Sequence, residues 1–141
     1  MATIEDFAKI EMKIGTILSA EFIEGADKLL KLSVDFGPLP IPIQKIQEAL
    51  PEIEINPQGD EASLQVIPQP TRDIRQILSG IREYYQPLQL IGKQCPFITN
   101  LEPRTMRGLT SYGMILAVGL ESGGAMLLHP ENEVSPGSKL R

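Results

Sequence analysis

Two arginines three residues apart, Arg104 and Arg107, are the side chains of this sequence best suited to binding chemistry. They stand in the stretch of residues 100–117, where Pro103 interrupts any regular strand. A short loop leaves little room to bury a guanidinium group, so both arginines are expected at the surface. Guanidinium groups bind phosphate and stack on bases, and Asn100 adds a donor and an acceptor for a base edge or a 2′-hydroxyl. The pattern predicts a binding surface rather than a catalytic centre.

The residues that enzymes and metal sites need are scarce in this chain. There is one histidine, His129, with no nucleophile suitably spaced, and the single cysteine, Cys95, falls in an expected core strand. One Cys and one His cannot make a zinc site of the usual kind, and no glycine-rich segment matches a P-loop or a dinucleotide fingerprint. The sequence therefore predicts no enzyme, no metal and no cofactor.

Composition favours one soluble domain. The chain has 141 residues, of which 42% are hydrophobic and 22% charged. No apolar run approaches the roughly 20 residues of a membrane helix, so no membrane association is expected. The N-terminus lacks the basic and apolar regions of a signal peptide, and one cysteine excludes an intramolecular disulfide. Together these features predict a cytoplasmic protein.

The net charge of −5 argues against nucleic acid until its distribution is considered. Residues 37–70 contain five acidic residues and one lysine, whereas residues 72–107 contain six basic and three acidic residues. Because the acidity is concentrated in one segment, one face of the protein can still be positive.

Alternating apolar residues predict an all-β domain. Thr3, with Asp6 three residues on, predicts the N-cap of a short helix over residues 4–9. Residues 10–22 and 30–36 read as two long antiparallel strands, with Gly15 marking a bulge or sharp curvature. The apolar residues that share one face of each strand are Ile10, Met12, Ile14, Leu18, Ala20 and Phe22 in the first, and Leu30, Leu32, Val34 and Phe36 in the second. Further short strands are expected near residues 72–79 and 95–101, and residues 114–118 read as a core strand. Many short strands with few helices argue for a small closed barrel. Residues 37–70, with seven prolines, read as an acidic insertion whose simplest interpretation is a tolerated surface excursion.

Several sequence blocks carry a family resemblance. They are Asp6–Ile10, Lys13–Gly15, Ala26–Leu29, Arg75–Ile81, Tyr84–Tyr85, Ile91–Lys93, Asn100–Leu101, Pro103–Arg104, Arg107–Gly108, Ser111-x-Gly113 to Ala117, and Pro136–Ser138. In this order the blocks resemble the tRNA-binding oligonucleotide/oligosaccharide-binding (OB) fold domain. That domain occurs alone as a bacterial dimeric protein and at the C-terminus of many methionyl-tRNA synthetases.

The resemblance implies a fold and a function. It implies a single domain over residues 1–141: a five-stranded Greek-key OB barrel with short helices, the 37–70 insertion, and a C-terminal extension at about 120–141. It implies a non-catalytic homodimer that binds tRNA by shape and that could assist an aminoacyl-tRNA synthetase in trans. The expected tRNA-binding residues combine the resemblance with charge and position; they are Lys28, Lys31, Arg75, Ser79, Arg82, Asn100, Arg104, Arg107 and Ser111.

An alternative interpretation keeps the barrel and changes its partner. The chain has Glu102 and Thr105 where the family usually carries basic residues, and it has an acidic, proline-rich insertion. These departures favour a protein-interaction or export-chaperone (CsaA-like) module, a second branch of the same fold. The two interpretations predict different binding partners for one barrel.

Overall fold

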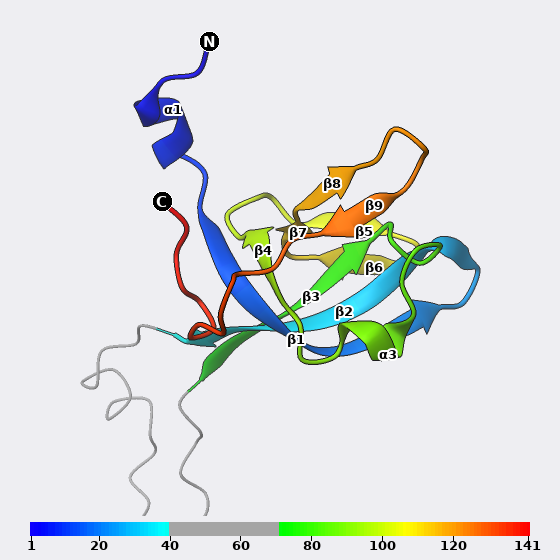
Figure 1. Cartoon of the computed structure of the whole chain (residues 1–141). Helices are drawn as coiled ribbons and strands as arrows, with labels where there is room; N and C mark the ends of the chain where they lie inside the picture. The colour runs from blue at the N-terminus through cyan, green and yellow to red at the C-terminus, as the bar shows by residue number, and fades with distance from the viewer. Residues whose placement is uncertain (40–70) are drawn as a thin grey trace, which may run out of the picture. The chain divides into compact units, whose positions relative to one another are not determined.

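The computed structural model describes residues 1–39 and 71–141, and Figure 1 draws residues 40–70 as a thin grey trace. Most of the expected insertion at 37–70 therefore lies outside the described residues. The chain divides into one unit formed by Met1–Gly37 with Asp73–Arg141, and a second formed by Pro38–Arg72. The core and the candidate site both belong to the first unit.

A five-stranded sheet forms the body of the domain, and it curls into a half-barrel of the OB type, as the sequence predicts. In spatial order its strands are β3 (Arg72–Ser79), β2 (Ala26–Pro38), β1 (Met12–Ile23), β4 (Gln94–Ile98) and β7 (Met114–Ile115). Two small hairpins complete the β structure: β5 (Arg104–Met106) with β6 (Leu109–Ser111), and β8 (Ala117–Gly119) with β9 (Ala125–Leu127). The fold is all-β with short helices.

The alternation of β2 builds much of the core. Leu30, Leu32 and Val34 are fully buried and Phe36 almost so, which confirms the predicted inward face of this strand. The Phe36 ring meets that of Phe97 on β4 edge to face, with 5.3 Å between the ring centres. Pairing of β1 with both β2 and β4 closes the sheet around this cluster.

The predicted inward face of β1 is wrong in the first part of the strand. There Ile17, which has the opposite parity, is fully buried in the core, and Leu18 is half-exposed. The register with β2 shifts between Ile17 and Ser19, and an irregularity of one residue exchanges the two faces of a strand. Beyond the shift, Ala20 lies opposite Leu32 and packs against the core, as predicted. Gly15 is not at the bulge. It allows the β1 backbone to approach the Phe36 ring closely, since a Cβ atom on Gly15 would lie 2.7 Å from that ring.

Two short helices flank the sheet. Helix α1 (Ile4–Ala8) begins at the Thr3 N-cap, whose side chain accepts from the Asp6 N–H while Asp6 accepts from the Thr3 N–H. No residue of α1 is buried, and Figure 1 shows this helix beyond the N-terminal end of β1. Helix α3 (Pro87–Leu90) buries Leu90 and lies against β1. The expected N-terminal helix is thus present, and it stands apart from the core.

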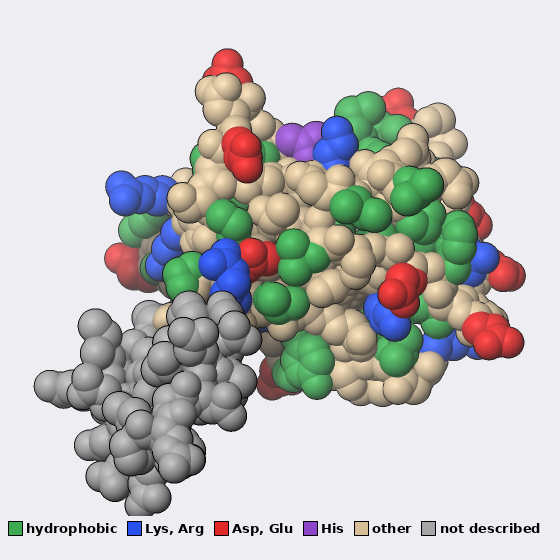
Figure 2. All heavy atoms as spheres, turned by 90° about the horizontal axis from the view of Figure 1, so that it is seen from below, with side chains coloured by type: hydrophobic (Ala, Val, Ile, Leu, Met, Phe, Trp, Pro, Cys, Tyr) green, Lys and Arg blue, Asp and Glu red, His purple; other side chains and the backbone are tan. Residues whose placement is uncertain are grey.

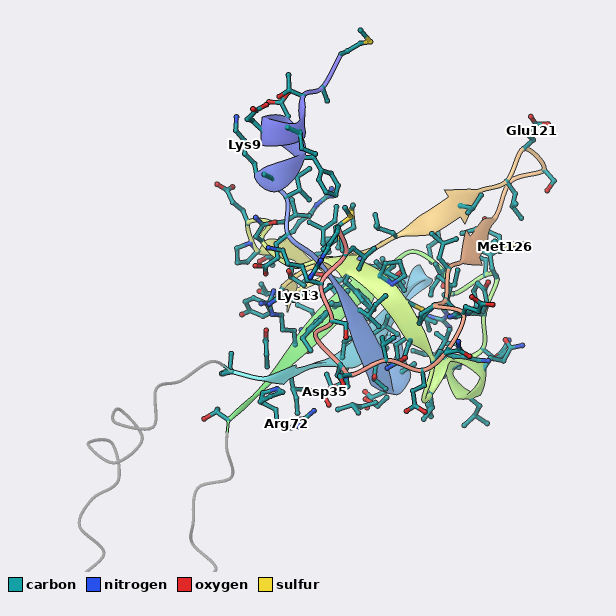
Figure 3. All side chains as sticks on the ribbon, turned by 60° about the vertical axis from the view of Figure 1, so that its left-hand side comes forward. Lys9, Lys13, Asp35, Arg72, Glu121 and Met126 are labelled. Atoms are coloured by element: carbon teal, nitrogen blue, oxygen red, sulfur yellow. The ribbon has the colours of Figure 1, made fainter. Side chains whose placement is uncertain are left out.

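Residues 114–118 do not form the predicted core strand. Met114 and Val118 remain 44% and 42% exposed, because β7 pairs with β4 through two residues and the chain then leaves the sheet as β8. The β8–β9 hairpin carries Met126 and, at its tip, Glu121, both labelled in Figure 3. An apolar run therefore became an edge strand followed by an exposed hairpin.

The C-terminal tail returns to β1. The Ile14 N–H donates to Ser138 O at 2.8 Å, the Gly137 N–H donates to Ile14 O at 2.7 Å, and the Leu140 N–H donates to Met12 O at 2.9 Å. The Gln94 side chain holds the tail at a second point, because it bonds both backbone groups of Val134. The last residues of the chain therefore add to the edge of this domain.

Candidate nucleic-acid interface

The β5–β6 hairpin turns through only two residues, Arg107 and Gly108. Met106 pairs with Leu109, and the two turn residues have φ angles of 53° and 77°. Positive φ at both positions is the type I′ turn, which suits the twist of a hairpin and favours Asn or Gly at its first position. Among the described residues, Arg107 is the only non-glycine residue with positive φ. A basic side chain thus occupies a turn position where the backbone disfavours it by about 1 kcal/mol.

Packing fixes this hairpin to the sheet. Met106 and Leu109 pack on a small cluster of Ile23, Ala26 and Leu78. The Gln76 side chain on β3 donates to the Thr110 carbonyl at 2.9 Å, and the Tyr112 N–H donates to the Gln76 carbonyl at 3.0 Å. The hairpin is therefore a rigid projection.

Arg104 and Arg107 are exposed on this projection, as the sequence predicts for a short loop. Neither forms an ion pair with another described residue. The hydroxyls of Thr105 and Thr110 face each other at 3.2 Å on the same hairpin. Two cations and two hydroxyls on a fixed ribbon can meet the phosphates and sugars of a folded RNA.

The remaining predicted cations differ in how free they are. Lys28 is exposed, whereas Lys31 pairs with Glu21 at 3.0 Å. Arg75 pairs with Asp73 through two nitrogens and also donates to the carbonyls of Thr99 and Tyr112.

Arg82 donates to the carbonyls of Ile23 and Ala26, and its guanidinium lies 4.5 Å from the centre of the Phe22 ring. Arg75 and Arg82 therefore already support the fold, and their contact with RNA stays a prediction.

The predicted polar contacts are likewise engaged within the protein. Ser111 is buried; its hydroxyl accepts from the Leu78 N–H and donates to Gly113 O, each at 3.0 Å. Ser79 is also buried. The Asn100 side chain is exposed, and it accepts from the Glu11 N–H and donates to Lys9 O, both at 2.7 Å. Ser111 and Asn100 thus hold the rim in place. A direct role of Ser79, Asn100 and Ser111 in RNA binding stays a prediction.

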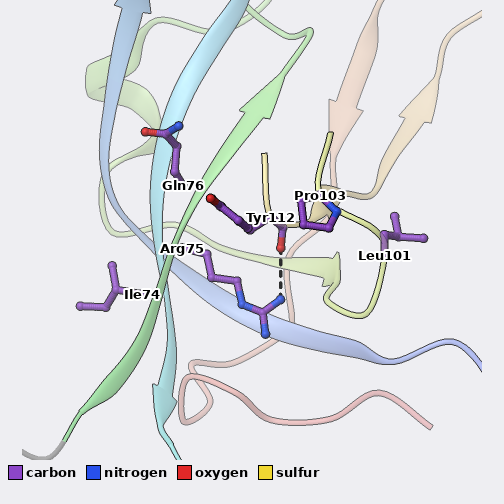
Figure 4. A pocket seen from close by; sticks show the side chains of 6 residues that line it. All are labelled: Ile74, Arg75, Gln76, Leu101, Pro103 and Tyr112. Atoms are coloured by element: carbon purple, nitrogen blue, oxygen red, sulfur yellow. Dashed lines mark hydrogen bonds between the residues drawn. The ribbon is translucent and has the colours of Figure 1, made fainter. Parts of the chain in front are cut away.

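A hollow of about 470 Å³ lies beside the hairpin, and sequence reasoning missed it (Figure 4). Its lining residues are Ile74, Arg75, Gln76, Leu101, Pro103 and Tyr112. A neighbouring hollow of about 310 Å³ brings Lys31 and Arg75, two predicted binding residues, to one surface. The sequence signal for the first hollow was an aromatic residue, Tyr112, beside the basic loop. Three of its other walls, Ile74, Arg75 and Gln76, come from β3, which is distant in the chain.

The charges are mixed on the face that Figure 2 shows, where basic, acidic and apolar side chains alternate over the surface. No single positive patch dominates that face. The charges on that face therefore do not form a broad positive field.

Glu11 illustrates how the rim is held electrostatically. Its carboxylate accepts from the Thr99 hydroxyl at 2.7 Å and lies 3.4 Å from the Lys13 ammonium. The hydrogen bond from Thr99, aided by the charge of Lys13, lowers the pKa of Glu11 below its usual value. The carboxylate therefore stays ionised where β1 meets the Asn100 loop.

Cys95 and His129 lie together without forming a catalytic pair. The Cys95 Sγ is 3.6 Å from His129 Nδ1, but the same nitrogen is 2.7 Å from the Gln94 carbonyl. Because a carbonyl only accepts, Nδ1 carries the proton and cannot take one from the thiol. Burial raises the pKa of the Cys95 thiol to about 11.

The buried thiol is expected to be inert in the folded protein. At pH 8 an aromatic disulfide reagent should label Cys95 at least about 100-fold more slowly in the native chain than in urea, because burial suppresses both thiolate formation and access. Absorbance of the released thiolate measures the rate. Rapid native labelling would contradict the burial of this thiol against His129.

The described residues contain no cluster of three metal-ligating side chains and no helix able to span a membrane. What they do contain is a small OB-type barrel with a rigid basic hairpin. The class of protein defined by this combination is a nucleic-acid-binding barrel.

The chain belongs to the family described as a putative tRNA binding domain, whose sequence model matches residues 50–139. This family is a binding domain, not a catalytic one. Methionine–tRNA ligases are its sequence relatives: that of Methanococcoides burtonii is 36% identical over 138 residues, and that of Xylella fastidiosa (strain 9a5c) 37% over 139. Each match covers 98% of this chain and 15% of the relative, so the chain spans about 15% of the length of those ligases.

Solved structures give the same fold. A protein related to methionyl-tRNA synthetase from Pyrococcus horikoshii has a TM-score of 0.71 and 27% identity, covering 100% of this chain and 98% of that one. The CsaA chaperone of Bacillus anthracis has a TM-score of 0.70 and 27% identity, covering 100% and 99%. Both branches named by the sequence resemblance are therefore structural neighbours.

Proposed function

We propose that this chain is a non-catalytic, cytoplasmic protein that binds tRNA by its shape. The observation that carries the proposal is the rigid β5–β6 hairpin, which presents Arg104 and Arg107 to solvent without ion-pair partners among the described residues. Phosphate contacts from such cations fix a protein on a folded RNA without reading its sequence. Membership of the tRNA-binding family supports the choice of RNA.

The RNA surface extends from the hairpin tip. Arg104, Arg107 and the exposed Lys28 contact phosphate. Lys31, Arg75 and Arg82 lie behind them, and Asn100, Ser79 and Ser111 complete the surface, mainly by holding the loops that carry the cations.

The functional unit is a homodimer. Large apolar side chains remain exposed around β7 and on the β8–β9 hairpin: Met114, Val118, Leu120, Met126 and Leu128. Exposed apolar groups gathered on neighbouring elements mark an interaction surface. A dimer formed there carries two copies of the β5–β6 hairpin, and each copy offers one basic surface to the same tRNA. Similarity to part of the methionine–tRNA ligases supports assistance to a synthetase in trans.

The salt dependence of tRNA binding tests this proposal. Titration of labelled bulk tRNA at about 50 and 200 mM salt should give saturable binding at both concentrations. A plot of the logarithm of the association constant against the logarithm of the salt concentration should fall with a slope, called here the salt slope, of about one unit per phosphate contact. Sedimentation of the complex should show two chains per tRNA. Absence of saturable binding at low salt would refute tRNA as the ligand, and a 1:1 complex would refute the dimer.

The chaperone alternative keeps one specific support, the likeness to the CsaA fold, together with Glu102 and Thr105 at the hairpin. It predicts that the chain suppresses aggregation of an unfolded client and binds tRNA only weakly. An aggregation assay with a reduced, unfolded client protein, run beside the tRNA titration, separates the two functions.

A further inference from the structure

The hollow beside the β5–β6 hairpin gathers large apolar side chains that nothing in the described chain covers. Ile74, Leu101 and Tyr112 are 51%, 46% and 46% exposed, and all three line the same space. They come from β3, from the loop after β4 and from the residue after β6. In Figure 4 the side chains of Tyr112 and Leu101 stand on either side of Pro103.

The backbone of Tyr112 is clamped on both sides, so the position of its ring is prepared in advance. Its N–H donates to the Gln76 carbonyl at 3.0 Å, and its carbonyl accepts from the Arg75 guanidinium at 3.1 Å, the bond dashed in Figure 4. Arg75 is itself fixed by Asp73. An aromatic residue held in this way loses little conformational entropy when a flat group stacks on it.

The polar groups around the hollow complement a nucleotide. The side-chain amide N–H of Gln76 donates to the Thr110 carbonyl. The side-chain oxygen of Gln76 is left as an acceptor for the exocyclic amino group of a base. Arg104 is exposed and follows Pro103, a wall of the hollow, directly in the chain, so a cation is available for the phosphate of the same nucleotide. An apolar peptide side chain would fill the walls but would use neither the acceptor nor the cation.

We infer that the hollow is a seat for one unpaired nucleotide of the bound RNA, whose base stacks on Tyr112 and whose phosphate meets Arg104. The nucleotide must be unpaired because the face of a base within a helix is already covered by its neighbours. This inference rests on the proposed tRNA binding and adds to it a contact that is stacking rather than electrostatic. A volume of several hundred cubic ångströms suits a small-molecule-sized group.

Stacking and phosphate contacts differ in how they respond to salt, and the test uses this difference. Tyr112→Ala should weaken tRNA binding about 5- to 100-fold and leave the salt slope of the affinity unchanged. Tyr112→Phe, which keeps the ring, should bind within about twofold of the parent chain. Arg104→Ala, by contrast, should lower the slope by about one unit. Leu101→Ala removes a second wall of the hollow. A loss of tRNA affinity in this variant as well would show that the loss in Tyr112→Ala does not come from a folding defect at residue 112.

A titration without tRNA decides the inference independently of the proposed function. The isotope-labelled chain is titrated with a four-residue oligoadenylate and, separately, with an apolar pentapeptide, and amide signals are followed by NMR. Saturable shifts at Ile74, Gln76, Leu101 and Tyr112 with the oligoadenylate support the nucleotide seat, whether or not tRNA binds.

Three results would overturn the inference. The first is unchanged tRNA affinity in Tyr112→Ala, and it leaves the proposed function standing. The second is a response of these amides to the peptide alone, which makes the hollow a peptide site. The third is the absence of any response to the oligoadenylate. Failure of the proposed function has a different signature, namely no tRNA binding by the parent chain.

Discussion

Gly137→Ala is expected to lower the free energy of unfolding by about 3 kcal/mol, because it combines backbone strain with a steric overlap. Gly137 has φ of 89°, and a Cβ atom there would overlap the carbonyl oxygen of Phe36 at the end of β2. Gly37 faces it in the same way, because a Cβ on Gly37 would overlap the carbonyl of Pro136. Two backbones touch at this point with no room for a side chain on either.

The tail segment released by this substitution is the one that pairs with β1. Loss of the bonds that join Gly137 and Ser138 to Ile14 should speed hydrogen exchange at the Ile14 amide, whose acceptor is the Ser138 carbonyl. Urea unfolding followed by circular dichroism measures the stability change.

Gly25→Ala is the matched control. Gly25 has φ of 78°, but no atom lies within 4 Å of the position its Cβ would take. This variant carries only the backbone cost, about 1 kcal/mol. Equal losses in Gly25→Ala and Gly137→Ala would show that the tail does not press against β2.

Removing both hairpin arginines should weaken tRNA binding about tenfold or more and lower the salt slope by about two units. The variant Arg104→Ala with Arg107→Asn is the sharper form of this experiment. Asn adopts the left-handed conformation more readily than Arg, so the turn at residues 107 and 108 should be kept and its stability slightly raised. Affinity and stability are thus expected to move in opposite directions.

A control of equal charge separates the hairpin from net charge. Lys9→Ala with Arg141→Ala also removes two positive charges, from exposed sites next to α1 and at the C-terminus. Filter-binding or anisotropy titrations of the two variants at several salt concentrations give the comparison. If both lose affinity equally, tRNA responds to the overall charge and the hairpin is not its contact surface.

The strain at Arg107 points to the same conclusion as its charge. A turn that favours Asn or Gly carries an arginine, the only described non-glycine residue with positive φ. Strained positions concentrate where a side chain serves a function. Arg107→Asn is therefore expected to raise stability while it lowers affinity.

Some of the fold was predictable because local and tertiary preferences agree. The alternation of Leu30, Leu32, Val34 and Phe36 predicts the inward face of β2, and that face is buried. Helix α1 was predictable from Thr3 and Asp6, because a capping box is a purely local interaction. The prediction for residues 114–118 failed because an apolar run does not reveal which strands will pair with it.

The sequence by itself determined the all-β class, the inward face of β2 and the exposure of Arg104 and Arg107, since these depend on periodicity and on the length of a loop. Only the tertiary structure decided which of the predicted binding residues remain available, because Arg75 is held by Asp73 and the Asn100 side chain by the backbone of Lys9 and Glu11. It also decided that Tyr112, Ile74 and Leu101 meet around one hollow. Such contacts join residues far apart in the chain, and their pairing is set by how the sheet closes, which no local pattern records.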